Sequence, residues 1–326
     1  MPRLRPVAAA LALGAMLASA TPAAAADSYP SRPVKIIVPF GAGGPTDLFT
    51  RAVAEELTKA LHQPFVLENR PGAGTTIGTE VAAKAPRDGY TLLMVSGTQT
   101  VNETLYGHKP YHLMTDLTPV APLIESDLVL VVHPSVPAKD LDDLITFAKA
   151  NPGKLNFGSS GPGSNYHMAA ELLKNLTGID IVHVPYRGST GMRTDILSGQ
   201  IQMLFDSVPT MAPMIKSGMV RALGTSGLER SPILPDVPTI AEAGVPGFQA
   251  TLWVGFMAPA GTPQPILDLL NREITKIVER PDIKAAWAQQ GATAMTMSAP
   301  QFKVFMQDQV AKWAKVIADN HIRHIN

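Results

Sequence analysis

The sequence lacks cysteine altogether, has few aromatic residues and carries no excess of charge of either sign. Its 326 residues include no cysteine, and aromatic side chains make up 6%. Disulfides, cysteine nucleophiles and cysteine metal ligands are therefore excluded, so stability must come from burial, which a 45% apolar composition supports. Basic and acidic residues number 27 each, so nothing in the charge balance draws the protein to nucleic acid or to an anionic membrane surface.

Motifs typical of enzymes are missing as well. The chain contains no G-x-x-x-x-G-K-[ST], no H-E-x-x-H and no G-x-S-x-G. One glycine loop reads G-x-G-x-x-T and lacks the third glycine of a dinucleotide fingerprint. The eight histidines are scattered, and no nucleophile, base and orienting group can be assembled around them. We expect no catalytic residue, no metal and no cofactor.

The N-terminal residues have the features of a cleaved export signal. Arg3 and Arg5 form a short positive region, and an apolar stretch follows from Val7 to about Ala20. The run Ala23 to Ala26 then offers A-x-A cleavage sites. The alternative is a membrane anchor, but an apolar run of roughly 14 residues is shorter than the about 20 that cross a hydrocarbon core. We therefore predict a signal peptide over residues 1–26 and a periplasmic protein.

Short apolar runs alternate with amphipathic helical patterns along the rest of the chain. We predict strands at about Val34–Val38, Phe65–Leu67, Thr91–Val95, Leu128–Val132, Leu155–Phe157, Ile181–Val184, Ile201–Phe205 and Thr251–Met257. We predict helices at about Thr46–Leu61, Leu141–Ala150, Ser164–Leu176, Thr190–Leu197, Pro265–Arg280 and Pro300–Ala318. This alternation indicates an α/β fold, and the length favours two domains. Ligands on such sheets bind beyond the carboxyl ends of the strands.

Two loops that follow strands and open helices offer backbone donors to an anion. The glycine loop, residues 40–47, holds Gly41, Gly43 and Gly44, and its glycines let N–H groups turn toward one point. The serine loop, residues 158–164, adds three serine hydroxyls, and His167 follows in the first helical turn. Together they suggest a ligand whose acidic group is held from two sides. The alternative is two ordinary turns, the first with Thr46 or Asp47 as a helix N-cap.

Three further residues lie where a ligand could meet them. Asp206 ends a predicted strand, where it is either an acceptor for a ligand or an N-cap. Trp253 lies in the Thr251–Met257 strand and either lines the cleft or packs in the core. Thr98 begins the segment that follows the Thr91 strand.

The sequence resembles a known protein family over nearly its whole length. The mature chain is similar to the substrate-binding proteins of tripartite tricarboxylate transporters, also called Bug proteins. The resemblance is carried by a series of short blocks in a fixed order: Ile36 to Phe40, Gly43-Gly44 with Asp47, Glu68 to Gly74, Asp88 to Leu93, Pro152 to Leu155, the serine loop, His183 to Tyr186, Leu234 to Thr239, Glu242 to Gly244 and Ala258 to Pro263. The sequence departs from the usual pattern at Ala42 and Arg187, and the segment that begins at Thr98 also looks variable within the family. The resemblance implies that these places decide which ligand binds.

The resemblance implies a type II periplasmic binding protein fold, with two α/β domains, each a mixed sheet flanked by helices, and a ligand cleft between them. One domain is expected at residues 27–128 plus 252–326 and the other at 129–251, with crossing strands near Leu128–Val132 and Leu252–Met257. The implied ligand is a di- or tricarboxylate or an aromatic carboxylate. The implied ligand-binding residues are Phe40, Gly43, Gly44, Thr46 and Asp47 in the first loop and Ser160, Gly163, Ser164 and His167 in the second.

The implied function is capture of that carboxylate and its delivery, by a monomer, to the integral membrane subunits of a tripartite tricarboxylate transporter. One alternative is a binding protein that reports to a sensor kinase. Another is a secreted α/β hydrolase, which would need the catalytic constellation that this sequence lacks.

Protein recovered from the exported fraction should begin at or next to Asp27, because the alanine run before it fits signal peptidase. N-terminal sequencing of that fraction tests this expectation. A chain that still carries residues 1–20 would contradict it.

Overall fold

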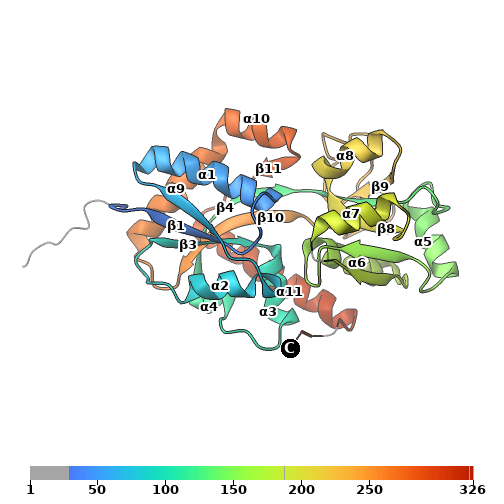
Figure 1. Ribbon diagram of the computed structural model, residues 1–326, viewed down its shortest axis with the longest axis horizontal. Coiled ribbons are helices and arrows are strands. Elements are labelled where there is room, and N and C mark those ends of the chain that lie inside the picture. Colours follow the sequence, from blue (N-terminus) through green and yellow to red (C-terminus); the bar gives the residue numbers. More distant parts are fainter. Residues whose placement is uncertain (1–28, 187, 323, 326) are drawn as a thin grey trace, which may run out of the picture.

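The chain forms two sheets, each with its own set of helices, in an elongated molecule (Figure 1). The computed structural model describes residues 29–186, 188–322, 324 and 325. The expected signal peptide and Arg187 therefore lie outside the described residues. We call each sheet, together with the helices that pack on it, a lobe. The first lobe contains most of the residues before position 127 and after position 251.

The first lobe is built on a six-stranded mixed sheet. Strand β1 pairs in parallel with β2 and β3, whereas β10 runs antiparallel to β3 and β4, and β11 runs antiparallel to β4. The order across the sheet is β11 (Ala292–Ala294), β4 (Leu117–Ser126), β10 (Leu252–Pro259), β3 (Thr91–Ser96), β1 (Val34–Val38) and β2 (Phe65–Asn69).

Helices cover both faces of this sheet (Figure 1). One face packs against α1 (Pro45–Leu61) and α9 (Gln264–Glu279), next to which lies α10 (Pro281–Gln289). The other face packs against α2 (Thr76–Ala83), α4 (Leu113–Asp116) and α11 (Ala299–Asp319), with α3 (Gly97–Leu105) beside α11. A single 3₁₀ turn, η1 (Ala73–Thr75), precedes α2.

The second lobe repeats the same design on a smaller scale. Its five-stranded sheet has the order β7 (Val182–Pro185), β6 (Asn156–Ser159), β8 (Met203–Ser207), β5 (Leu128–Val132) and β9 (Arg221–Thr225). Its helices are α5 (Leu141–Ala150), α6 (Asn165–Thr177), α7 (Ser189–Leu197) and α8 (Val208–Lys216). Strand β6 is parallel to β7 and β8, so the loops after these three strands lie at one edge of the sheet.

The chain passes between the sheets twice. It leaves the first sheet at Asp127, the single residue between β4 and β5. On its return, the Ala250 N–H still donates to the Ser226 carbonyl of the second lobe at 3.1 Å, and two residues later Leu252 begins β10 in the first sheet. Strands β5 and β10 therefore each belong to one sheet. The crossings are short segments beside these strands, whereas we expected continuous hinge strands.

Most predicted elements agree with the structure, and the differences have local causes. Strand β8 begins two residues later than predicted, because Gln202 lies in a turn where its side chain accepts from the Asn156 N–H at 3.0 Å. Strand β4 was not predicted, since Pro119 and Pro122 lie in its interior. The pairing of β10 with β4 shifts register at both prolines, which accommodates the missing N–H groups.

None of the helices within the described residues has both the length and the apolarity needed to span a bilayer.

Gly255 in β10 shows how tightly the first core is packed. A Cβ at this position would collide with the Phe302 ring and lie 2.9 Å from the Ala121 carbonyl oxygen. Gly255→Ala should therefore lower the free energy of unfolding by about 1–3 kcal/mol through overpacking. Urea denaturation measures the change. Gly41→Ala, where an added Cβ meets nothing within 4 Å, is the control and should unfold like wild type. Equal stability of the two variants would contradict this packing.

Candidate functional site

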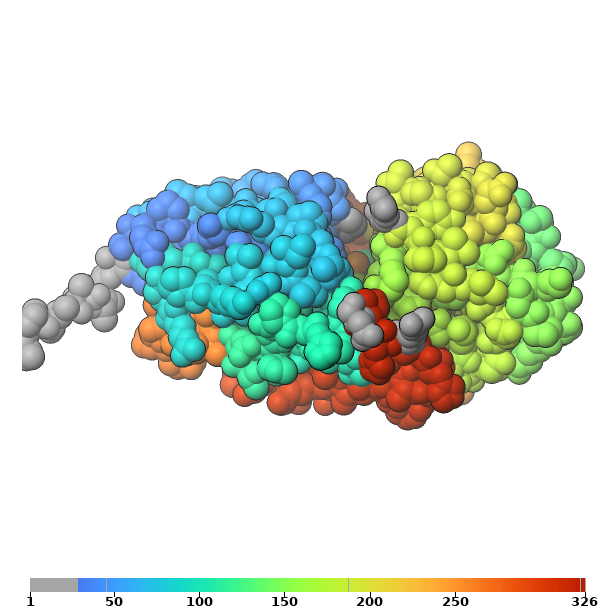
Figure 2. All heavy atoms as spheres, turned by 60° about the horizontal axis from the view of Figure 1, so that its bottom comes forward, coloured from blue at the N-terminus to red at the C-terminus, as the bar shows by residue number. Residues whose placement is uncertain are grey.

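The loops that face the other lobe open five helices. Helices α1 and α3 follow the parallel strands β1 and β3, and α6, α7 and α8 follow β6, β7 and β8. In Figure 1 the N-terminal end of α1 lies toward the second lobe, and Figure 2 shows a cleft between the blue first lobe and the yellow-green second lobe. The positive ends of helix dipoles therefore gather around this cleft, as an anion site requires.

The glycine loop is held in shape from inside by Asp47. The Gly43 N–H donates to Asp47 Oδ2 at 3.0 Å, with Gly43 at a φ of +82° that glycine adopts readily. The Asn69 amide donates to Asp47 Oδ1 at 2.9 Å and to the Phe40 carbonyl at 3.1 Å. Burial opposes the charge of Asp47, but the hydrogen bonds from Asn69, Gly43 and Arg51 outweigh it and lower the pKa of this carboxyl.

Asp47 thus orients the loop. It accepts the Gly43 N–H, which we expected among the donors available to the ligand, and leaves other atoms of the loop for a ligand. Its side chain is only 3% exposed, and both oxygens accept hydrogen bonds from the protein. In contrast, no acceptor among the described residues is bonded to the N–H groups of Thr46 and Asp47 in the first turn of α1. Gly44, the N-cap residue, has an extended backbone and is partly exposed beside them.

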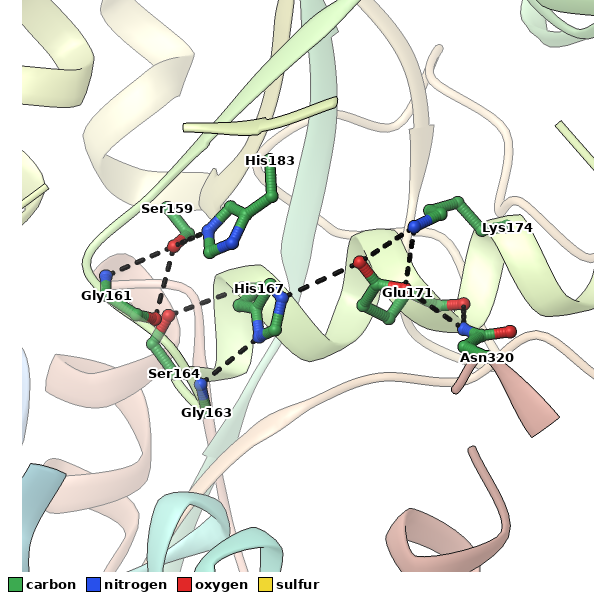
Figure 3. Close-up of polar contacts among 9 residues, drawn as sticks. All are labelled: Ser159, Gly161, Gly163, Ser164, His167, Glu171, Lys174, His183 and Asn320. Atoms are coloured by element: carbon green, nitrogen blue, oxygen red, sulfur yellow. Dashed lines mark hydrogen bonds and ion pairs between the residues drawn. The ribbon is translucent and has the colours of Figure 1, made fainter. Parts of the chain in front are cut away.

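The serine loop is also held by hydrogen bonds within its own lobe, to the imidazoles of His167 and His183 (Figure 3). Ser159 Oγ lies 2.6 Å from His183 Nε2 and accepts the Gly161 N–H at 3.1 Å. The Gly163 N–H donates to His167 Nδ1 at 3.2 Å. This N–H group therefore points into the lobe, whereas we expected it among the donors available to the ligand. The N–H groups of Asn165 and Tyr166 in the next turn have no bonded acceptor within the described residues.

Gly163 and Ser164 have distinct structural roles in this loop. A Cβ on Gly163 would lie 2.7 Å from Leu105 Cδ2 and 3.3 Å from Asn102 Oδ1, both on α3 of the first lobe. Gly163 therefore allows the two lobes to touch beside the cleft. Ser164 caps α6, since its Oγ accepts the His167 N–H at 3.3 Å. Ser160 is partly exposed at the tip of the loop.

The Ser159–His183 pair lacks the features of a hydrolase dyad. Ser159 is fully buried and its hydroxyl is bonded within its own loop, so a substrate carbonyl cannot approach it. His183 stacks on His167 with 4.0 Å between ring centroids. Burial, followed by the neighbouring His167, lowers the pKa of His183 to about 3, so the ring stays neutral. No carboxylate in the described part of the chain is bonded to His183 to orient it as a base.

Asp206 lies at the end of β8 but holds a protein group. It accepts from Arg193 Nε at 2.5 Å and Nη2 at 3.0 Å, and from the Ser207 N–H at 2.7 Å. Asp206 is completely buried, whereas the Arg193 side chain is 22% exposed. The partly exposed member of this pair is therefore Arg193, which the sequence did not point to as a site residue. The sequence did contain one indication of this role, because Arg193 lies about one turn into a predicted helix that follows a predicted strand.

Thr98 and Trp253 are both buried in the first lobe. Thr98 is in the first turn of α3 and is 6% exposed. Trp253 packs in the core, with its ring 5.8 Å from Phe302 and 5.3 Å from Phe305, so the core-packing alternative holds for it. Its indole N–H is buried with no partner among the described residues, and Gly97 lies beside it.

A second hollow lies behind the crossings and contains none of the predicted residues. This cavity of about 370 Å³ is lined by Glu125, Asp127 and Arg230, together with residues 291–293. In the two sheets, β11 and β9 lie on this side of the crossings, whereas β3 and β8 lie on the cleft side. Burial, and then the nearby Glu125, raises the pKa of Asp127 to about 6.

Comparison with known proteins identifies the family. The chain matches the model of the tripartite tricarboxylate transporter family receptor over residues 49–322. BugT of Bordetella pertussis is 40% identical over 311 residues, which cover 94% of this chain and 95% of BugT. A protein from the tcbD–tcbE intergenic region of a Pseudomonas species is 38% identical over 97% of this chain and 94% of its own length. The chain belongs to the tripartite tricarboxylate transporter receptor family.

Solved structures of this receptor family share the fold. An adipate complex from R. palustris has a TM-score of 0.83 and 34% identity, covering 91% of this chain and 99% of its own. MatC from Rhodopseudomonas palustris with bound malate has a TM-score of 0.79 and 32% identity, covering 89% and 100%. The protein has the α/β, two-domain periplasmic binding protein fold of type II, as the sequence predicts, with two mixed sheets and a cleft between them.

The hydrogen bonds of Asp47 predict that this residue stabilises the fold and that the stabilisation depends on pH. Asp47→Asn should lower the free energy of unfolding by about 1–3 kcal/mol, because it removes the charge and one acceptor from a buried network. The pKa of Asp47 is lowered in the folded state, so its stabilisation is present above the ordinary carboxyl value and lost as the pH falls through the lowered one.

Urea unfolding should therefore separate the variant from wild type at pH 6 and separate them less well below about pH 4. Asp236→Asn, at an exposed carboxylate, is the control. A constant difference between wild type and Asp47→Asn across this range would refute the ionised network.

Proposed function

We propose that this protein is an extracytoplasmic solute-binding protein that captures a small organic carboxylate between its two lobes. In this proposal it works in the periplasm as a monomer, without catalysis. It delivers the acid to the integral membrane subunits of a tripartite tricarboxylate transporter. The observation that carries the proposal is the pair of helix N-termini at the cleft, α1 on the first lobe and α6 on the second. Each has N–H groups that donate no hydrogen bond to any described residue.

The chemistry of these groups suits a carboxylate. Backbone N–H groups at a helix N-terminus carry a partial positive charge and already point outward, so binding an anion requires no rearrangement of the backbone. The acidic groups beside them, Asp47 and Asp206, are buried and bonded to protein donors, which limits repulsion of an anionic ligand. Arg193, though paired with Asp206, is partly exposed and adds hydrogen-bond donors at the second lobe.

The class of acid is suggested by the relatives. One similar structure holds adipate and another holds malate, both dicarboxylates. We propose a di- or tricarboxylate or an aromatic carboxylate for this chain, with contacts from residues of both loops. The ligand-facing set then comprises Phe40, the backbone of Gly44, Thr46 and Asp47, the serine loop at Ser160 and Ser164, and the side chain of Thr98. Gly43, Gly163, His167 and Asp206 do not contact the ligand in this proposal; their hydrogen bonds within the protein hold the ligand-facing residues in place.

A carboxylate that binds in the cleft should stabilise the mature protein. At a hundred times its dissociation constant a ligand adds about 2.7 kcal/mol by mass action, which raises the melting temperature of a protein of this size by about 5 °C. A thermal-shift screen of adipate, malate, citrate and benzoate measures this effect. Closure of the lobes around the acid should also reduce the radius of gyration in small-angle X-ray scattering.

Methyl esters of the active acid are the control. They keep the carbon frame but lose the charge that the N–H groups bind most strongly, so they should give little shift. Equal stabilisation by acid and ester would rule out anion capture. If no carboxylate in a broad panel stabilises the protein, the proposed function is wrong.

A further inference from the structure

The Gly163–His167 hydrogen bond constrains the imidazole to one tautomer. The Gly163 N–H is a donor, so His167 Nδ1 must carry its lone pair toward the serine loop. A neutral imidazole then carries its proton on Nε2, on the opposite side of the ring. His167 is 4% exposed and stacks on the neutral His183, so the surrounding core restricts its rotation. One buried side chain therefore sets the direction of a backbone group in the proposed binding loop.

Glu171, one turn further along α6, faces the other side of the His167 ring (Figure 3). Its Oε1 lies 3.6 Å from His167 Nε2. Both carboxylate oxygens lie 3.0 Å from Lys174 Nζ, and the Glu171 side chain is 5% exposed. Burial opposes the charge of Glu171, but His167 and Lys174 outweigh it and lower its pKa. The carboxylate is therefore ionised and favours the tautomer with the proton on His167 Nε2.

The first lobe reaches the same carboxylate. Asn320 at the C-terminal end of α11 donates to Glu171 Oε2 at 3.2 Å and also to the Glu171 backbone carbonyl. Helix α11 packs on the first sheet and contacts α6 of the second lobe, and in Figure 2 its red C-terminal end lies against both lobes. The chain of contacts from Asn320 through Glu171 and His167 to Gly163 therefore joins one lobe to the serine loop of the other.

We propose that Glu171 and Asn320 are positioning residues for ligand capture. They hold the His167 ring so that it keeps the Gly163 N–H turned inward, which leaves the donors of the next turn, at Asn165 and Tyr166, directed at the cleft. This inference rests on the proposed function for its effect on affinity. The ring orientation itself is independent of any ligand, so it is tested separately.

The affinity test uses four variants and two probes, adipate and malate, measured by isothermal titration calorimetry. Glu171→Ala should weaken binding about tenfold, the lower end of the effect of losing a supporting group behind a binding residue. Glu171→Gln keeps an oxygen for His167 Nε2–H and should restore most of the affinity. Asn320→Ala, which removes one hydrogen bond, should weaken binding about threefold.

Asn175→Ala is the matched control for Asn320→Ala. Asn175 also joins α6 to α11, through Asp319 Oδ2 at 3.4 Å, but its side chain makes no hydrogen bond to the Glu171 side chain among the described residues. It should leave affinity unchanged. Loss of thermal stability in Glu171→Ala and Asn320→Ala with wild-type affinity would assign these residues a merely structural role and overturn the proposal, as would an equal loss of affinity in Asn175→Ala.

The second readout is the ¹⁵N spectrum of His167 in the protein without ligand. Wild type should show a protonated Nε2 and an unprotonated Nδ1, and Glu171→Ala should show a mixture of tautomers or an exchange-broadened signal. A protonated Nδ1 in wild type, or an unchanged tautomer in Glu171→Ala, would overturn the proposal. If neither probe binds wild type while the tautomer shifts as expected, the proposed ligand class fails and the positioning contact stands.

Discussion

The first turn of a helix leaves N–H groups without partners, and this constraint organises the protein. Such groups are useful to a ligand only if the loops before them are held so that the N–H groups point outward. Here each loop is fastened by a side chain that turns inward: Asp47 on the glycine loop, His167 on the serine loop and Asp206 at the start of α8. The carboxylates and the imidazole near the cleft therefore form hydrogen bonds within the protein. The backbone N–H groups of the first helical turns remain for the proposed ligand.

This division also fits the proposed capture of an anion by a protein whose basic and acidic residues are equal in number. Buried carboxylates lie close behind the cleft, but each is bonded to protein donors, as Asp206 is to Arg193 and Glu171 is to Lys174. Helix dipoles act over short range and need no excess of basic residues. The same paired groups connect the lobes, because Glu171 is reached by Asn320 from α11. The Glu171 carboxylate thus both supports His167 behind the serine loop and joins the two lobes.

The sequence predicted the loops more reliably than the direction of their atoms. Strand β1, strand β5 and helix α5 occupy the predicted residues, since apolar runs and helical periodicity depend on local neighbours. Strand β4 was missed because its two prolines oppose a strand, and only pairing with a bulged β10 makes them acceptable. Gly163 was read as a donor to the ligand, yet its N–H is taken by His167 four residues later.

The sequence by itself therefore determined the α/β class, the family and the two glycine-containing loops, because these depend on periodicity and on residues adjacent in the chain. Tertiary structure alone decided which groups face the cleft. Arg193 meets Asp206 across 13 residues, and Asn320 meets Glu171 across 149. A carboxylate binds either a ligand or a neighbouring side chain, depending on which partner the fold brings within hydrogen-bond distance. The spacing of two residues along the chain does not determine their distance in space.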